Sequence, residues 1–178
     1  MAEHLIKTDR VGLRNWSDAD LLPMSRINAD PKVMAYFPST QDEAYTQKFI
    51  DSQQRAFAVE SYCFFAADEL LTGNLMGFIG ILKFNFNTDF SPGIEIGWRL
   101  GHDYWGKGYA TEGAKAVLTY AFHQLNIPEI WSFTTITNQR SEKVMQKIGM
   151  EKVGTFEHPK VDVGHQLRPH VLYHIAKP

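Results

Sequence analysis

Two glycines flank a lysine in the segment 105–110, WGKGYA, and this pattern is suited to binding a pyrophosphate. Glycines let the backbone approach a ligand closely. If a helix begins here, its first N–H groups are unpaired and its dipole presents a positive end to an anion. An ordinary tight turn has the same composition, so the flanking residues must decide between the two interpretations.

The segments on the two sides of this turn have different periods. Residues 94–100 alternate between apolar and other side chains, which predicts a strand with one apolar face. From residue 110 the apolar side chains follow one helical stripe, made of Ala110, Ala114, Val117, Leu118, Ala121, Phe122 and Leu125. The sequence therefore predicts a strand, a glycine turn and a helix, the arrangement of an anion-binding helix N-terminus.

A nucleotide-binding P-loop is one alternative for this turn. Gly101, four further residues and Gly106-Lys107 match its spacing, but Gly108 stands where a P-loop has the Ser or Thr that holds magnesium. No later run of four apolar residues ending in Asp supplies a second metal-binding element. The pattern argues against a nucleotide hydrolase, and magnesium-dependent ATP binding would distinguish this alternative.

The segments that must position the turn can be predicted in chain order. A strand is expected at 11–14, then a helix capped by Ser17 and Asp20 that runs to about residue 28. Residues 30–37 suggest a turn or short helix, and Thr40 with Glu43 predicts the cap of a helix ending near residue 57. Strands at 62–68 and 75–84 form a hairpin that leads into the 94–100 strand.

After the long helix the sequence predicts a strand at 130–137, a helix at 138–149, and strands at 151–156 and 170–176. Asn138 is suited to cap that helix and Gly149 to end it. We find no repeat, low-complexity segment or linker, so residues 1–178 are expected to form one domain of α/β class with a mixed sheet.

Composition narrows the class of protein. The chain has 178 residues, 44% of them hydrophobic, with 18 basic and 20 acidic side chains, so no strongly cationic nucleic-acid-binding surface is indicated. The single Cys63 lies in an apolar run and is expected to be a buried thiol, not a nucleophile. No signal core and no membrane span of about 18 apolar residues is present, so we expect a cytoplasmic protein without membrane contact.

The glycine turn resembles the acyl-CoA motif of the GNAT N-acetyltransferases, (Gln/Arg)-x-x-Gly-x-(Gly/Ala). Gly108 and Ala110 occupy its last two fixed positions, while Trp105 stands where Gln or Arg is usual. Asn138 with Ser141, followed by the segment 148–150, is similar to a second motif of that family. The resemblance extends from residue 11 to residue 175, and the run 104–114 and the tail 156–175 are similar to the RimJ/RimL-type branch.

This resemblance implies a GNAT-like fold, with a twisted, mostly antiparallel central sheet that has a V-shaped splay and is flanked by helices. It implies acetyl-CoA as donor, no metal, and direct transfer to a primary amine in a ternary complex. The similarity to the RimJ/RimL-type branch implies a protein N-terminal α-amine as the acceptor. A small-molecule amine such as a polyamine or an antibiotic, and a non-catalytic acyl-CoA-binding module, remain alternatives.

The resemblance also implies roles for particular residues. Backbone amides are expected to hold the pyrophosphate and the pantetheine arm, and Ser141 to protonate the leaving sulfur. The expected donor-binding residues are Trp98, Arg99, Leu100, Lys107, Gly108, Tyr109, Ala110, Thr111, Asn138 and Ser141.

Glu95 is the candidate general base, since it lies ten residues before Trp105, the spacing found in glutamate-dependent members of the family. A carboxylate there can take the proton of the amine directly or through one water. Alternatively, Glu95 faces solvent or only orients an acceptor ammonium. An α-amine, with a pKa of roughly 7.7–8, needs a base less than a lysine side chain does.

The acceptor is the least defined part of the prediction. In the family, the region around Tyr36 and Phe37 forms one wall of the acceptor groove, although burial statistics favour core packing for aromatic residues. His170 is expected to border the same groove. None of the histidines near the C-terminus has the paired spacing of a zinc site. The acceptor, the acyl chain and the choice between monomer and homodimer stay open.

Overall fold

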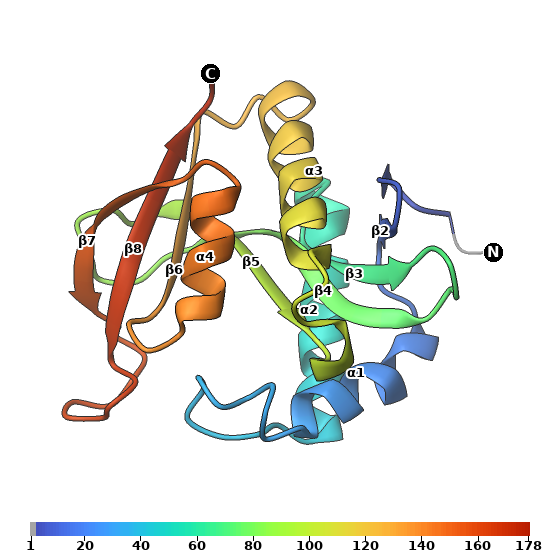
Figure 1. The fold of residues 1–178 in the computed structure, drawn as a ribbon, viewed down its shortest axis with the longest axis horizontal. Coiled ribbons are helices and arrows are strands. Elements are labelled where there is room, and N and C mark those ends of the chain that lie inside the picture. Colours follow the sequence, from blue (N-terminus) through green and yellow to red (C-terminus); the bar gives the residue numbers. More distant parts are fainter. Residues whose placement is uncertain (1–2) are drawn as a thin grey trace.

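The structure, a computed structural model, describes residues 3–178 and contains one eight-stranded sheet flanked by helices (Figure 1). The strand order is β1-β2-β3-β4-β5-β6-β8-β7. The strands are β1 (Ile6–Lys7), β2 (Val11–Arg14), β3 (Phe64–Glu69), β4 (Leu75–Phe84), β5 (Gly93–Leu100), β6 (Glu129–Thr135), β7 (Glu151–Glu157) and β8 (Pro169–Ala176).

The sheet is antiparallel except at one junction. β5 and β6 run parallel and are registered at a single pair, Glu95 with Trp131, after which the two strands separate (Figure 1). By contrast, β4 and β5 are paired along the whole of β5. The predicted mixed, mostly antiparallel sheet with a V-shaped splay is therefore confirmed, and the splay lies between β5 and β6.

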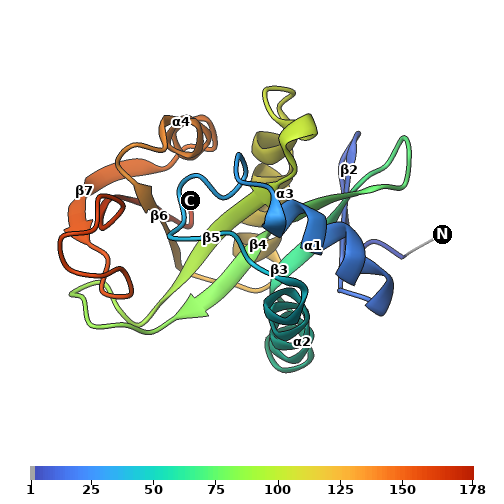
Figure 2. The ribbon, with the colours of Figure 1, turned by 90° about the horizontal axis from the view of Figure 1, so that it is seen from below.

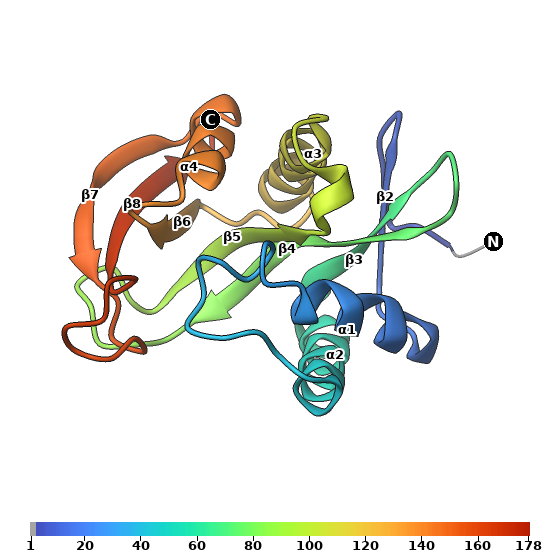
Figure 3. The same ribbon diagram turned by 60° about the horizontal axis from the view of Figure 1, so that its bottom comes forward.

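Helices cover both faces of the sheet. Figures 2 and 3 show α1 (Leu21–Ala29) and α2 (Glu43–Glu60) on one face, with α3 (Tyr109–His123) and α4 (Gln139–Lys147) on the other. Two short 3-10 helices, η1 (Asp18–Asp20) and η2 (His102–Tyr104), precede α1 and α3. The gap between β5 and β6 is therefore the place where elements from the two faces of the sheet come together.

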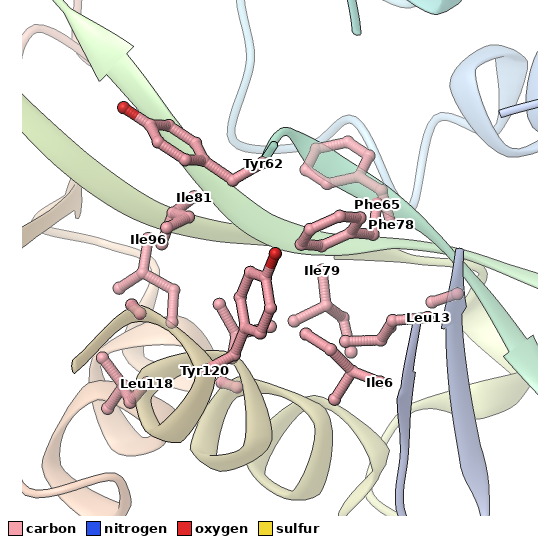
Figure 4. Close-up of a cluster of buried hydrophobic side chains, with 14 of the residues drawn as sticks. Ile6, Leu13, Tyr62, Phe65, Phe78, Ile79, Ile81, Ile96, Leu118 and Tyr120 are labelled. Carbon is pink, nitrogen blue, oxygen red and sulfur yellow. The ribbon is translucent and has the colours of Figure 1, made fainter. Parts of the chain in front are cut away.

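The core fixes the position of α3 against the sheet. Figure 4 shows Ile79 and Ile96 of the strands directed toward Leu118 and Tyr120 of α3. A Cβ on Gly113 would lie 2.5 Å from Ile79 Cδ1, so this glycine allows the helix to approach the sheet closely. Because α3 packs closely against the sheet, its N-terminus has a fixed position at the end of β5.

Most of the predicted elements are confirmed, and the differences lie at their ends. The predicted cap at Thr40 is wrong: Asp42 caps α2, its carboxylate accepting the Tyr45 N–H at 2.7 Å. The helix also continues to Glu60, beyond the predicted end. Residues 31–36 form turns, and β1 was not predicted because two residues carry no periodicity.

Cys63 is fully buried, and burial raises the pKa of its thiol, in line with the expected core position. In the part of the chain that the structure describes, no helix is long and apolar enough to cross a membrane.

Candidate active site

A cavity of about 950 Å³ lies where β5 and β6 separate. Its walls come from both strands, from the glycine turn with the start of α3, from α4, from the segment between α1 and α2, and from the β7–β8 connection. The volume is within the range of small-molecule and cofactor sites. This cavity is therefore the candidate active site.

At the apex of the splay, the buried Ser132 donates a hydrogen bond from Oγ to the carbonyl oxygen of Ile96, at 2.9 Å. The carbonyl of Ile96 therefore faces β6. Backbone groups alternate in direction along a strand, so the amides of Trp98 and Leu100 face the gap. The amide of Arg99 faces β4 instead. Two unpaired amides thus point into the cavity from β5.

The glycine turn exposes further amides. Gly106 and Gly108 have φ angles of 73° and 87°, in the left-handed region that glycine tolerates. The first helical hydrogen bond of α3 runs from the Glu112 N–H to the Gly108 carbonyl at 3.0 Å. The N–H groups of residues 109–111 therefore have no partner within the helix, and these residues line the cavity.

Arg10 holds the turn in place, a role that the sequence did not suggest. Its Nη1 donates to the Lys107 carbonyl at 2.9 Å, and its Nε donates to Glu112 Oε2 at 2.7 Å. Its guanidinium also lies 4.7 Å from the centre of the Tyr109 ring. A Cβ on Gly108 would come within 3.3 Å of Arg10 Nη2. Lys107 is outside the cavity lining, so its structural contact is through its carbonyl.

Three cations of α4, Arg140, Lys143 and Lys147, line the same cavity. The guanidinium of Arg140 lies 4.7 Å from the centre of the Trp105 ring, beside the glycine turn. Unpaired amides and cations facing one cavity suit a ligand with several phosphates, so the site fits a CoA molecule. These three cations were not predicted as site residues, although their helical spacing in the sequence places them on one face of α4.

Asn138 and Ser141 are placed together at the start of α4. Asn138 Oδ1 accepts the Ser141 N–H at 3.3 Å, and its Nδ2 donates to Ser141 Oγ at 3.1 Å and to Thr134 Oγ1 at 3.0 Å. Asn138 caps the helix, as predicted. Because the Ser141 hydroxyl accepts from Asn138, its own proton stays available for another acceptor. Both residues line the cavity.

The carboxylate of Glu95 lines the cavity without a hydrogen bond or ion pair to any other residue of the described chain. Burial raises the pKa of Glu95 to about 7, and the positive charge of Lys160 opposes this shift. A carboxyl group with such a pKa is partly ionised at neutral pH and can both take up and release a proton there. That is the property required of a general base.

Two neutral histidines lie across the cavity from β5. The rings of His158 and His170 are 4.8 Å apart, and both side chains line the cavity. Burial lowers the pKa of both, that of His158 to about 4. His170 Nδ1 lies 2.9 Å from the Arg168 carbonyl oxygen, which only accepts, so Nδ1 carries the proton and Nε2 is an acceptor. Among residues 3–178, no His, Cys, Asp or Glu cluster has the grouping of a metal site.

Tyr36 and Phe37 lie at the cavity and not in the core. Tyr36 is half-buried and Phe37 is 41% exposed, and both contribute to the lining. The burial statistics that favoured core packing were therefore a poor guide here. The Phe37 ring lies 4.3 Å from the Arg99 guanidinium, which is on the same side of the sheet as Glu95.

One cavity thus contains free amides and cations suited to a ligand with several phosphates, together with an unpaired carboxylate, and these are groups that an acyl-CoA-dependent acyltransferase uses. Comparison with known proteins agrees. The sequence matches the acetyltransferase (GNAT) domain family over residues 10–151. The chain belongs to the GNAT acetyltransferases. It is therefore an acyltransferase that takes its acetyl group from acetyl-CoA and acts on amines, and the P-loop alternative is wrong.

Similar proteins cover nearly the whole chain. It is 30% identical over 155 residues to the uncharacterized N-acetyltransferase YnaD of Bacillus subtilis (strain 168), with 85% of each chain covered. A solved GNAT-family acetyltransferase from Bacillus anthracis superposes with a TM-score of 0.81, at 28% identity, covering 97% of this chain and 98% of that one.

Two more distant proteins differ in the acceptor that their names state. A ribosomal-protein-S5-alanine acetyltransferase from Vibrio fischeri has a TM-score of 0.76 at 15% identity, over 96% of this chain and 95% of its own. The spermidine N(1)-acetyltransferase of Escherichia coli (strain K12) is 24% identical over 155 residues, 83% of this chain and 76% of its own.

Proposed function

We propose that the protein acetylates a primary amine by direct transfer in a ternary complex, with Glu95 as general base. The observation that carries this proposal is the unpaired carboxylate of Glu95, which lies beside the splay with a pKa of about 7. Glu95 takes a proton from the acceptor ammonium, and the resulting neutral amine is the nucleophile.

The donor is held by backbone groups on one side of the splay. We propose that the amides of residues 108–111 bind the pyrophosphate, and that Trp98, Leu100 and Asn138 bind the pantetheine arm. Acetyl-CoA, when bound, supplies an acetyl group activated as a thioester. Holding both reactants in line is worth on the order of 7–11 kcal/mol of the barrier.

Ser141 is the proposed proton donor to the leaving sulfur. Its hydroxyl accepts a hydrogen bond from Asn138 Nδ2 and so directs its own proton elsewhere. This arrangement supports the role that the family resemblance suggested. As the C–N bond forms and the C–S bond breaks, Ser141 would give its proton to the sulfur and the second proton of the amine nitrogen would pass to solvent. Ser141 would then recover a proton from solvent, and Glu95 would release its own, so that each turnover yields one net proton.

For the acceptor, we propose an α-amine of RimJ/RimL type in preference to a polyamine. Among the described residues that line the cavity, Glu95 is the one acid, while Arg99 and Lys160 are cations. A polyamine has several positive charges and would meet repulsion there. An α-amine, with a pKa of roughly 7.7–8, loses its proton to a base of pKa near 7 at little cost.

A mass-spectrometric acceptor screen tests the function. Peptides beginning with Ala, Ser or Met are incubated with acetyl-CoA beside spermidine and spermine, and each product is located on its amine. We expect acetylated peptide α-amines. Selective acetylation of the polyamines would overturn the acceptor class. Acetyl-CoA binding without turnover of any amine would favour a binding module instead of an enzyme.

A further inference from the structure

Arg99 presents a guanidinium to the cavity without an acidic partner. Its Nη1 donates to Asn28 Oδ1 at 2.7 Å, and its Nε is buried with no hydrogen-bond partner. No Asp or Glu in residues 3–178 forms an ion pair with it, and burial lowers its pKa to about 10. The group is still charged at neutral pH, so the cavity contains an unneutralised cation.

The guanidinium is held in one orientation. It lies 4.3 Å from the centre of the Phe37 ring and 5.4 Å from that of Phe78. Asn28 is itself fixed, because its Nδ2 donates to Thr46 Oγ1 at 3.0 Å, which leaves Oδ1 to accept from Arg99. A cation that is oriented in advance loses little conformational freedom when it binds a ligand.

A buried N–H of a charged group is costly to leave unpaired, and this protein pairs such groups elsewhere. Arg14, which is partly buried, donates to both Asp20 and Asp68, at 2.7 Å in each case. The contrast indicates that Arg99 lacks its natural partner. A carboxylate matches the planar fork of a guanidinium better than any neutral group does.

We propose that Arg99 binds a carboxylate of the acceptor, so that the preferred substrates are primary amines that also carry a carboxylate. This inference rests on the proposed acetyl transfer. Glu95 and Arg99 lie on the same face of β5, with Cα atoms about 13 Å apart in an extended strand. One end of such an acceptor lies at the base and the other at the guanidinium.

Matched acceptor pairs test the inference. One arm compares β-alanine with ethylamine and γ-aminobutyrate with propylamine. The other compares C-terminally amidated peptides beginning Ala-Asp and Ala-Asn, so the two arms separate free amino acids from acidic peptides. In at least one arm we expect wild-type kcat/KM to be about tenfold to a hundredfold higher for the carboxylate, the usual effect of a hydrogen bond to a charged group.

Variants then assign the preference to Arg99. Arg99→Gln should bring the ratio of kcat/KM within each pair close to one and leave acetyl-CoA affinity unchanged, while Arg99→Lys keeps part of the preference. Arg26→Gln, an exposed arginine of α1, is the control and should behave as wild type. Asn28→Asp is a second variant, for use if Arg99→Gln folds poorly. It provides an internal carboxylate for Arg99 and is also expected to abolish the preference.

Two results would overturn the inference. One is equal kcat/KM within all pairs in wild type. The other is a preference that survives in both Arg99→Gln and Asn28→Asp. Turnover of the amines in either case leaves the proposed acetyl transfer standing. If no amine is turned over, calorimetric titration of the CoA-saturated protein with the same pairs tests whether Arg99 binds a carboxylate. Equal affinities within each pair would reject the carboxylate site.

Discussion

Two groups of buried charges in this protein differ in how completely they are paired. At the corner of β2, β3 and η1, the Arg14 guanidinium donates to Asp20, to Asp68 and to the Asn15 carbonyl, and His4 also contacts Asp68 at 2.9 Å. At the cavity, Arg99 has a single amide oxygen as partner, and Glu95 has no partner in the described chain.

The pKa values of the carboxyl groups follow this difference. Burial raises the pKa of Asp20, but hydrogen bonds from Arg14 and the Ser17 backbone outweigh it, so the net shift is downward. Glu95 experiences burial without such donors, and its pKa rises to about 7. The same fold therefore uses paired charges to fix its structure and leaves unpaired ones where a ligand can reach them.

The largest effect is expected from breaking the cluster around Arg14. Arg14→Gln should lower the free energy of unfolding by about 3–5 kcal/mol, because it removes the cation shared by two buried carboxylates. Arg99→Gln should cost far less, since it removes a buried cation that has no acidic partner. Urea unfolding monitored by circular dichroism measures both variants. Equal losses would mean that the pairing of the two arginines has no bearing on stability.

The glycine turn should be the next most sensitive position. Gly108→Val forces a β-branched residue to a φ of 87° and pushes against Arg10, so the amides lose their arrangement. At a CoA concentration of a hundred times Kd, wild type gains about 2.7 kcal/mol of stability, and the variant should lose the corresponding rise in Tm. Magnesium should not be needed. Gly154→Val, in the open strand β7, is the control and should retain the shift.

Glu95→Gln should reduce kcat by roughly a hundredfold at neutral pH and leave acetyl-CoA affinity unchanged, which is within the usual range for proton transfer. The loss should shrink as pH rises, because solvent then deprotonates the amine. Steady-state kinetics from pH 6 to 9 measure it, with the exposed Glu151→Gln as control. An increase in KM at constant kcat would instead assign Glu95 to attracting the acceptor.

The smallest effect concerns stability against pH. The folded state holds a proton on Glu95 up to a pKa of about 7, whereas the unfolded chain releases it near a pKa of about 4.3. Between these values the folded state binds more protons, so stability falls as pH rises, by about 2.5 kcal/mol from pH 5 to pH 8. Glu95→Gln should remove this slope in urea unfolding at pH 5 and pH 8. An unchanged slope would mean that Glu95 ionises normally.

Local sequence patterns were sufficient for much of the fold. The alternation in β5, the glycine turn and the stripe of α3 were all predicted, because each depends on hydrogen bonds between near neighbours. The capping box of Ser17 with Asp20 and the cap at Asn138 were predicted for the same reason. The family motif then pointed to the proposed donor site, because the amides of that site belong to one short segment.

The tertiary structure decided what depends on residues far apart in the chain. The pKa of Glu95 is raised by burial and lowered in part by Lys160 from the β7–β8 connection. The turn is held by Arg10, which lies 97 positions away from Lys107 in the chain. Likewise, Arg99 meets Asn28 and not a carboxylate only because α1 packs there. Burial and charge pairing are sums over spatial neighbours, and no local pattern in one sequence records which neighbours those are.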